Sequence, residues 1–269
     1  MALLPLHDFF VFNDSIQQVS SFVPSENEGG IYEVLRVVDG IPLFLEDHLD
    51  RFYASSGIAG KSIRFNEIQI ENLLNQLIEY NKVKKGNILI SCKNNLKAFF
   101  IAHNYPTPEM IKNGVSCGIL KAERENPNAK VFQTTVRQQA NQLIEENGFY
   151  EVLLVDGEAR ITEGSRSNVF FVKDNSLFTP PASEVLLGIT RQKVLELAIK
   201  NDLKYSEEDI LLRDISSFDA VFLSGTSPKI LPVNKIEAFF YNTQNSVVTK
   251  LIESYESLIM RYISDKKNR

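Results

Sequence analysis

The chain has 269 residues, of which 43% are hydrophobic and 23% charged, and its formal net charge is −5 at pH 7. This composition is typical of a globular protein with a sizeable core and excludes a disordered or fibrous chain. The excess of acidic residues argues against a surface built for nucleic acid, so we expect small molecules as partners.

Apolar runs, cysteines and histidines exclude further classes of protein. No apolar run reaches the length of about 18 residues that a membrane span needs, and the opening residues lack a signal-peptide pattern. Cys92 and Cys117 stand in strand-like segments without CxxC spacing, which predicts buried free thiols. The three histidines form no i,i+4 pair. We therefore expect a cytoplasmic protein that neither crosses a membrane nor holds a metal.

Strands and helices alternate in the first third of the chain. Asp39-Gly40 is a typical hairpin turn, and it predicts two strands within residues 31–45. Apolar residues at helical spacing predict helices at 45–57 and 67–81. Two further strands are predicted in the segments 86–93 and 97–103.

Pro106 and Pro108 follow these strands, and closely spaced prolines end regular structure. We therefore predict a small N-terminal α/β domain at residues 1–108 and a larger domain at 109–269. The second domain is predicted to contain strands and helices in mixed order, within the segments 114–122, 134–147, 149–155, 161–172, 188–201, 219–225 and 229–233 and in a C-terminal amphipathic helix. Together the two domains predict an α/β or α+β fold.

Three features could bind an anion. Gly188 precedes a predicted helix whose first N–H groups, from Ile189 and Thr190, have no partners within the helix. The turn Ser224–Pro228, which contains Thr226, offers hydroxyls and a close backbone approach. Arg51 stands between apolar neighbours and suits phosphate geometry. Taken singly, each also fits an ordinary helix start, a surface turn or a surface arginine.

Two residues could act chemically on a ligand whose anionic group is bound in this way. Lys130 precedes Val131 and Phe132, and apolar surroundings would lower the pKa of its amine and make it nucleophilic. Glu163 and Gly164 precede hydroxyl and amide side chains at the entry to a strand, which a surface turn would also explain. Pyridoxal 5'-phosphate needs an amine, a phosphate cup and a carboxylate at its ring nitrogen, so the set of features predicts this cofactor.

In motif order the chain resembles the class IV aminotransferases, the pyridoxal phosphate enzymes of fold type IV. This family includes branched-chain aminotransferases, D-amino acid aminotransferases and 4-amino-4-deoxychorismate lyases. The resemblance extends from about Gly30 to Val233 through the motifs IYEVLRV, LEDHLDRFYAS, AKVFQTT, ITEGSRSNVFFV, LFTPP, LLGITR and SGTSPKILPV.

The resemblance implies a role for each motif. It implies the Schiff-base lysine at Lys130, the ring-nitrogen partner at Glu163 and the phosphate-binding arginine at Arg51. Further phosphate contacts are implied for the amides of Ile189 and Thr190 and for Thr226, and a place facing the substrate for Tyr32. The implied fold is a small N-terminal α/β domain with a larger C-terminal pseudo-barrel domain, in a homodimer whose active site borders both domains.

The chain also departs from the family's pattern. The Asn that many relatives carry shortly after the lysine is absent, as are the arginine-containing turn and the Arg-Pro pair that relatives use in the small domain. Lys93, Lys97, His103 and Arg166 are candidates to meet the substrate carboxylate, but each also fits an ordinary solvated side chain. Three hypotheses follow: an aminotransferase acting on a small amino acid and 2-oxo acid pair, a lyase that releases pyruvate from aminodeoxychorismate, and a non-catalytic phosphate-binding relative.

Overall fold

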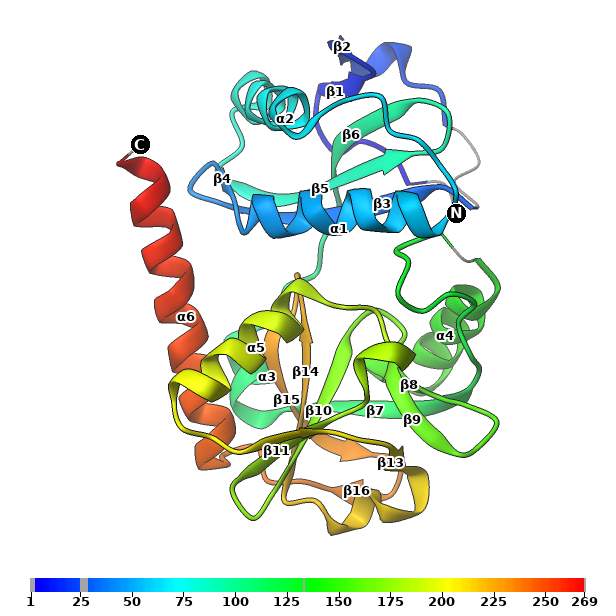
Figure 1. The fold of residues 1–269 in the computed structure, drawn as a ribbon, viewed down its shortest axis with the longest axis vertical. Helices are drawn as coiled ribbons and strands as arrows, with labels where there is room; N and C mark the ends of the chain where they lie inside the picture. Colours follow the sequence, from blue (N-terminus) through cyan, green and yellow to red (C-terminus); the bar gives the residue numbers. More distant parts are fainter. Residues whose placement is uncertain (1–2, 25–28, 133, 269) are drawn as a thin grey trace. The chain divides into compact units, whose positions relative to one another are not determined.

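The structure, a computed structural model, describes residues 3–24, 29–132 and 134–268. It divides into two compact units (Figure 1). Unit 1 comprises Met1–Asn104, Ala129–Phe132 and Ile259–Arg269, and unit 2 comprises Tyr105–Asn128 and Gln133–Leu258. The segment that carries Lys130 thus belongs to unit 1, although it follows a stretch of unit 2 in the sequence. The predicted division between residues 108 and 109 stays a prediction.

Unit 1 is built on an antiparallel sheet of six strands in the order β2-β1-β6-β5-β3-β4. The Asp39-Gly40 turn joins β3 to β4 as the sequence predicts, because both residues adopt the positive φ that such a hairpin requires. The strands of this sheet are β1 (Phe9–Phe12), β2 (Ser15–Gln18), β3 (Ile31–Val38), β4 (Ile41–Pro42), β5 (Lys85–Cys92) and β6 (Leu96–Ile101).

Two helices, α1 (Leu45–Ile58) and α2 (Glu67–Asn81), pack their apolar sides on one face of this sheet. Asn66 and Gln69 form a capping box that fixes the start of α2. The opposite face of the sheet carries an aromatic cluster around Phe10, Leu89 and Phe99. Successive residues of β3 therefore point to different surroundings.

Unit 2 contains a mixed sheet of ten strands, in the order β12-β11-β10-β14-β15-β7-β8-β9-β13 with β16 paired to β15. Its strands are β7 (Val115–Lys121), β8 (Glu151–Val155), β9 (Arg160–Gly164), β10 (Asn168–Lys173), β11 (Ser176–Thr179), β12 (Tyr205–Glu207), β13 (Ile210–Leu211), β14 (Ala220–Gly225), β15 (Lys229–Ile236) and β16 (Phe239–Phe240). Its helices are α3 (Pro108–Asn113), α4 (Thr134–Asn147), α5 (Ile189–Lys200) and the first part of α6 (Ser246–Lys267).

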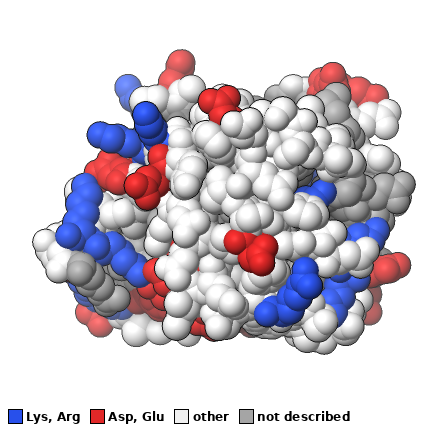
Figure 2. All heavy atoms as spheres, turned by 90° about the horizontal axis from the view of Figure 1, so that it is seen from above, with Lys and Arg blue, Asp and Glu red and all other residues white. Residues whose placement is uncertain are grey.

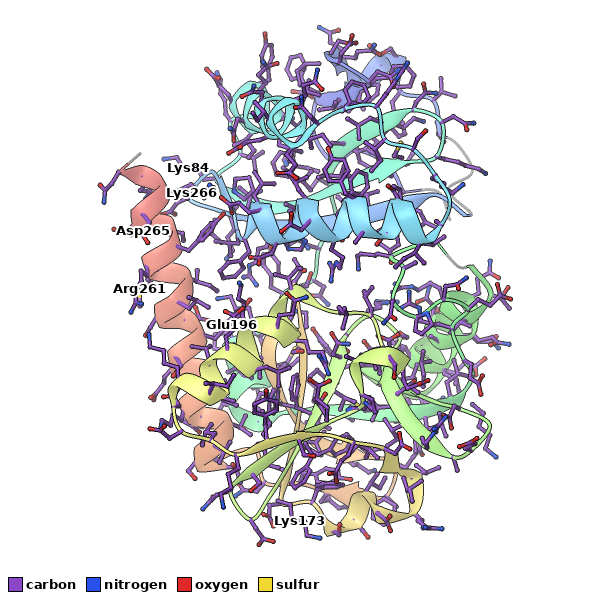
Figure 3. The ribbon with its side chains drawn as sticks, viewed as in Figure 1. Lys84, Lys173, Glu196, Arg261, Asp265 and Lys266 are labelled. Atoms are coloured by element: carbon purple, nitrogen blue, oxygen red, sulfur yellow. The ribbon has the colours of Figure 1, made fainter. Side chains whose placement is uncertain are left out.

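The last turns of α6 belong to unit 1 and meet the start of α1. Phe44, the residue before α1, has a left-handed backbone and provides no side-chain cap. The hydroxyl of Tyr262 takes that place, since it accepts a hydrogen bond from Leu45 N over 3.1 Å and donates to Glu46 over 2.7 Å. Lys266, on the same part of α6 as Tyr262, also pairs with Glu46 (Figure 3). The C-terminal helix thus caps α1.

The helices and most strands of the fold confirm the sequence predictions, but three features differ. Helix α3 lies in the proline-containing stretch that was expected to be irregular, and Thr107 caps it by accepting from Met110 N over 3.2 Å. Six strands were not predicted: β1, β2, β11, β12, β13 and β16. Glu163 lies near the end of β9 rather than at a strand entry, because the segment 160–164 forms a strand of its own.

Several predicted absences can be compared with the part of the chain that the structure describes. Within it, no helix is long and apolar enough to cross a membrane, and no group of His, Cys, Asp and Glu could hold a metal ion. Cys92 and Cys117 are both free and buried, as predicted. On the face drawn in Figure 2, acidic and basic side chains are interspersed around a mostly uncharged centre.

Candidate active site

In unit 1 the segment 129–132 is joined by hydrogen bonds to the start of β3. Tyr32 N donates to Lys130 O over 3.0 Å, and Phe132 N donates to Gly30 O over 2.9 Å. From the other side, Lys130 N donates to the hydroxyl of Ser55 on α1 over 3.0 Å. The backbone of Lys130 is therefore fixed between a strand and a helix.

Aromatic rings lie beside the amine of Lys130. Its Nζ atom lies 4.8 Å from the centroid of the Tyr32 ring, a distance at which a cation and a ring attract each other. Tyr32 in turn stacks on Phe132 with ring centroids 4.1 Å apart. The structure thus brings together two predicted site residues, Lys130 and Tyr32, and adds Phe132 to them.

Arg51, the predicted phosphate ligand, is buried with 9% exposure and forms a two-pronged contact with Glu33, which is fully buried. Its Nε and one Nη atom donate to the two oxygens of Glu33, each over 2.7 Å. His48 Nδ1 lies 2.8 Å from the same carboxylate. A guanidinium has five N–H donors, of which Glu33 accepts two. The pair fixes the orientation of Arg51.

Burial and charge shift the titration of this cluster. Burial alone would raise the pKa of Glu33, but the charge and hydrogen bonds of Arg51 and His48 bring it well below its usual range. Burial lowers the pKa of His48, against the opposing effect of Glu33, and the charges of Arg51 and Lys130 lower it further. The backbone of Lys130 is hydrogen-bonded to Ser55 on α1, the helix that also carries His48 and Arg51.

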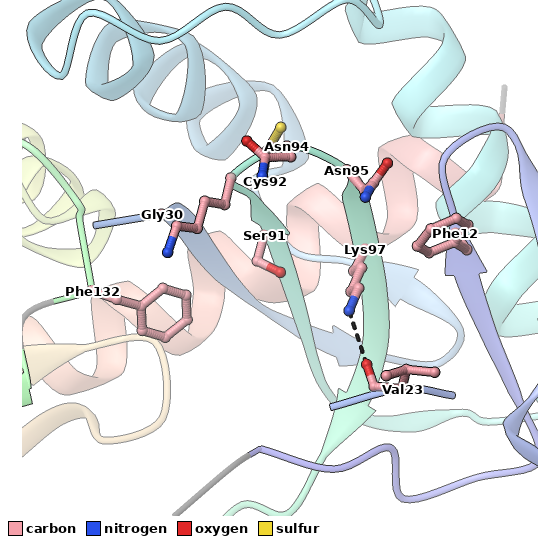
Figure 4. A pocket seen from close by; sticks show the side chains of 10 residues that line it. Phe12, Val23, Gly30, Ser91, Cys92, Asn94, Asn95, Lys97 and Phe132 are labelled. Atoms are coloured by element: carbon pink, nitrogen blue, oxygen red, sulfur yellow. Dashed lines mark hydrogen bonds between the residues drawn. The ribbon is translucent and has the colours of Figure 1, made fainter. Parts of the chain in front are cut away.

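A cavity of about 380 Å³ lies in unit 1, and Phe132 is part of its wall (Figure 4). Its walls come from β5, β6, the turn between them and the chain segments around Gly30 and Phe132. Lys97 lines it, and its ammonium donates to Val23 O over 3.0 Å. Burial lowers the pKa of Lys97. The full lining is Phe12, Val23, Gly30, Ser91, Cys92, Lys93, Asn94, Asn95, Lys97 and Phe132.

In unit 2 the carboxylate of Glu163 is buried, with 3% exposure, and has partners on both oxygens. Arg124 Nη1 donates to Oε1 over 2.8 Å. Leu186 N donates to Oε2 over 3.1 Å, and Asn168 Nδ2 lies 3.5 Å from the same atom. The positive charge of Arg124 favours the ionised carboxylate.

The anion-binding features of unit 2 meet around Asn168. Gly188, which offers no side-chain cap to α5, lies so close that a Cβ atom there would collide with the Asn168 amide. Asn168 also stands opposite Ser224 in the β10–β14 ladder, next to the turn that contains Thr226. Ile189 and Thr190, the first residues of α5, are buried. The start of α5 and the turn after β14 therefore flank the strand that follows Glu163.

An anionic group fits this part of unit 2. The Ser224 hydroxyl is fully buried and has no hydrogen-bond partner among the described residues. The uncapped start of α5 adds N–H groups and the positive end of the helix dipole. A buried hydroxyl and a bare helix start are both satisfied by phosphate oxygens, so the residues present suit the phosphate of the expected cofactor.

Other substrate candidates are dispersed. Arg166 lies in the turn after Glu163, and its guanidinium contacts the amide of Asn141 on α4. Lys93 and Lys97 line the cavity of unit 1, whereas His103 lies beyond the end of β6. Four residues with contacts to the candidate site were not predicted: Glu33, His48, Arg124 and Phe132. Glu33 carried a signal, because it is a lone carboxylate in the otherwise apolar strand pattern IYEVLRV.

Comparison with known proteins links this geometry to one family. Residues 30–236 match the family model described as amino-transferase class IV. A D-alanine aminotransferase of Bacillus licheniformis is 29% identical over 229 residues, which cover 77% of this chain and 79% of that protein. The branched-chain amino acid aminotransferase of Escherichia coli has a similar structure, with a TM-score of 0.84, 19% identity and coverage of 94% and 95%. A Legionella pneumophila protein provisionally named 4-amino-4-deoxychorismate lyase gives a TM-score of 0.77, with 20% identity and coverage of 88% and 97%.

Proposed function

The chain belongs to the class IV aminotransferases, enzymes of fold type IV that use pyridoxal 5'-phosphate, and from this premise we propose that it transfers an amino group between a small amino acid and a 2-oxo acid. The observation that carries the proposal is the grouping within each unit. In unit 1, Lys130 lies beside Tyr32 and is hydrogen-bonded through its backbone to α1, the helix from which Arg51 contacts Glu33. In unit 2, Glu163, Asn168 and the start of α5 lie together.

In this proposal the residues divide the work of binding and proton transfer. Lys130 holds the cofactor covalently through its amine and moves the proton at the substrate's Cα. Arg51, the amides of Ile189 and Thr190, and Thr226 bind the phosphate. When bound, pyridoxal 5'-phosphate supplies an electron-withdrawing ring that stabilises the negative charge developing at Cα.

Glu163 accepts a hydrogen bond from the protonated ring nitrogen of the cofactor. Its carboxylate is suited to this because Arg124 favours the ionised form and Leu186 N limits its rotation. The Tyr32 ring lies 4.8 Å from the amine of Lys130, and in this proposal Tyr32 faces the substrate. Arg166 is a candidate partner for the substrate carboxylate, as are Lys93 and Lys97 in the cavity of unit 1.

A second candidate function is the lyase reaction that releases pyruvate from aminodeoxychorismate. The fold is similar to that of the Legionella pneumophila protein. The cavity of unit 1, which two lysines line, suits a substrate with carboxylates. The third hypothesis, a non-catalytic relative, is not favoured, because the chain has both the candidate lysine and the candidate glutamate. We also propose that the protein is a homodimer in the cytoplasm. Light scattering of the purified protein would test the oligomeric state.

Two experiments test the proposal. Purified protein should be yellow, and borohydride should fix a pyridoxyl group on the peptide that contains Lys130. A colourless protein that does not take up added cofactor would refute the proposal. Incubation with a panel of L- and D-amino acids and 2-oxoglutarate should yield glutamate, whereas pyruvate from aminodeoxychorismate without an acceptor would instead indicate the lyase.

A further inference from the structure

Glu151, the first residue of β8, is a buried carboxylate that the proposed reaction does not use. Its exposure is 3%, and it accepts four hydrogen bonds. Oε1 accepts from its neighbour Val152 N over 3.0 Å and from the Ser165 hydroxyl over 2.6 Å. Oε2 accepts from Arg166 N over 3.1 Å and from the Ser167 hydroxyl over 3.0 Å. Three of these donors belong to one turn.

That turn, residues 164–167, joins Glu163 at the end of β9 to Asn168 at the start of β10. It is closed by a hydrogen bond of 2.7 Å from Gly164 N to Ser167 O and joined to β8 by one of 2.9 Å from Ser165 N to Val152 O. A Cβ atom on Gly164 would collide with the Ser167 hydroxyl and come within 3.1 Å of the Glu151 side chain. The turn is therefore built tightly against the carboxylate.

Only a carboxylate satisfies this arrangement of donors. An ionised carboxylate accepts at both oxygens, while a glutamine side chain accepts at one and donates at the other. A serine hydroxyl can reverse its role, but a backbone N–H cannot. Each orientation of a glutamine at this position would thus leave either Val152 N or Arg166 N without its acceptor. Burial and the neighbouring Glu151 together raise the pKa of Tyr150 to about 12.

We propose that Glu151 is the positioning residue for the turn between Glu163 and Asn168, and that it thereby sets the direction in which the Glu163 carboxylate faces the cofactor ring. Glu151 acts through the turn and does not touch the cofactor. The effect of Glu151 on the cofactor depends on the proposed function of Glu163. The effect of Glu151 on the conformation of the turn does not depend on that function.

The test compares Glu151→Gln with wild type and with the exposed control Glu158→Gln, using hydrogen exchange of peptides that cover residues 161–170. Exchange in Glu151→Gln should be faster by roughly tenfold or more, as expected when one buried N–H loses its acceptor. The control should exchange as wild type does. Exchange within about twofold of wild type in Glu151→Gln would overturn the proposal.

A second readout concerns the bound cofactor. In Glu151→Gln the pH dependence of cofactor absorbance should shift, and kcat should fall by a larger factor than KM rises. Rescue of the spectrum by Glu151→Asp would support a role for the carboxylate, and an unshifted spectrum in Glu151→Gln would contradict it. If the wild type binds no cofactor, the proposed function fails, while the exchange experiment still decides the role of Glu151 in the turn.

Glu151→Gln could fail to fold, which circular dichroism would detect. The double variant Ser165→Ala and Ser167→Ala then replaces it, because it removes two donors and leaves the buried carboxylate with its two backbone partners. Faster exchange across residues 161–170 in this variant would support the proposal, and unchanged exchange would overturn it.

Discussion

Replacing Glu33 with Gln should destabilise unit 1 by about 3–5 kcal/mol, the range measured when one member of a buried ion pair is removed. Glu33 is fully buried and accepts two hydrogen bonds of 2.7 Å from Arg51, besides its 2.8 Å contact with His48. A glutamine would retain one acceptor oxygen but would turn an NH2 group toward a donor. The guanidinium would keep its charge in a buried place but would lose the opposite charge of Glu33.

The same cluster predicts how stability depends on pH. The folded-state pKa values of Glu33 and His48 both lie below their ordinary values, so protonation favours the unfolded chain. The stability that they add is complete above about pH 7 and is lost as pH falls, below about 6.5 through His48 and below about 4.3 through Glu33. Glu33→Gln should remove the second part of this loss and leave a shallower decline between about pH 5 and 3.

Urea unfolding at pH 7, 5 and 4, followed by hydrogen exchange of peptides from β3 and α1, measures both effects. The control is Glu79→Gln on the exposed side of α2, which should change stability by less than about 0.5 kcal/mol. A Glu33→Gln protein as stable as this control at pH 7 would refute the reasoning. Unfolding curves of wild type that do not change from pH 7 to 4 would refute the pH argument.

Three further predictions follow from single contacts. Lys130→Ala should abolish borohydride fixation of the cofactor while circular dichroism remains that of wild type. Arg124→Met should shift the pH dependence of cofactor absorbance, because Glu163 loses the guanidinium 2.8 Å away, and Arg124→Lys should restore part of the signal. Tyr262→Phe should lower the free energy of unfolding by about 1–2 kcal/mol, since Leu45 N loses the hydroxyl that caps α1.

For each of these three predictions, one result would contradict the reasoning. Turnover of Lys130→Ala at the wild-type rate would refute the role of the lysine. An absorbance titration of Arg124→Met that overlays wild type would show that the ion pair does not act on the cofactor. Thermal unfolding of Tyr262→Phe at the wild-type midpoint would show that water replaces the tyrosine hydroxyl as the cap of α1.

Helices whose apolar residues recur at helical spacing were predictable from the sequence, and α2 shows why. Ile70, Leu73, Leu74, Leu77 and Ile78 are all buried in one core, so the period of the pattern and the packing agree. The sequence does not predict helix α3, because two closely spaced prolines usually end regular structure. At the first position of a helix, however, proline loses no hydrogen bond, and Thr107 before it is a favourable cap.

The partners of the candidate site residues could not be predicted in the same way. The motifs give positions along the chain, but Arg124 and Glu163 are 39 residues apart and Glu33 and Arg51 are 18 apart. Which side chains pair over such separations depends on how strands and loops pack. The acidic residue in IYEVLRV was a usable clue, because a carboxylate among apolar strand residues requires a cationic partner when buried.

Glu33, Glu151 and Glu163 are carboxylates with 3% exposure or less. Apolar residues of similar volume often stabilise a core as well as a buried ion pair does, so stability alone does not account for three such groups. The three carboxylates differ in the hydrogen-bond donors that they contact. Glu33 orients an arginine, Glu163 is itself oriented by an arginine and a backbone N–H, and Glu151 gathers neutral donors of the turn that follows Glu163. In our proposals Glu33 and Glu151 thus hold other parts of the candidate site, whereas Glu163 is itself held. These roles would explain why acids stand where apolar residues would pack equally well.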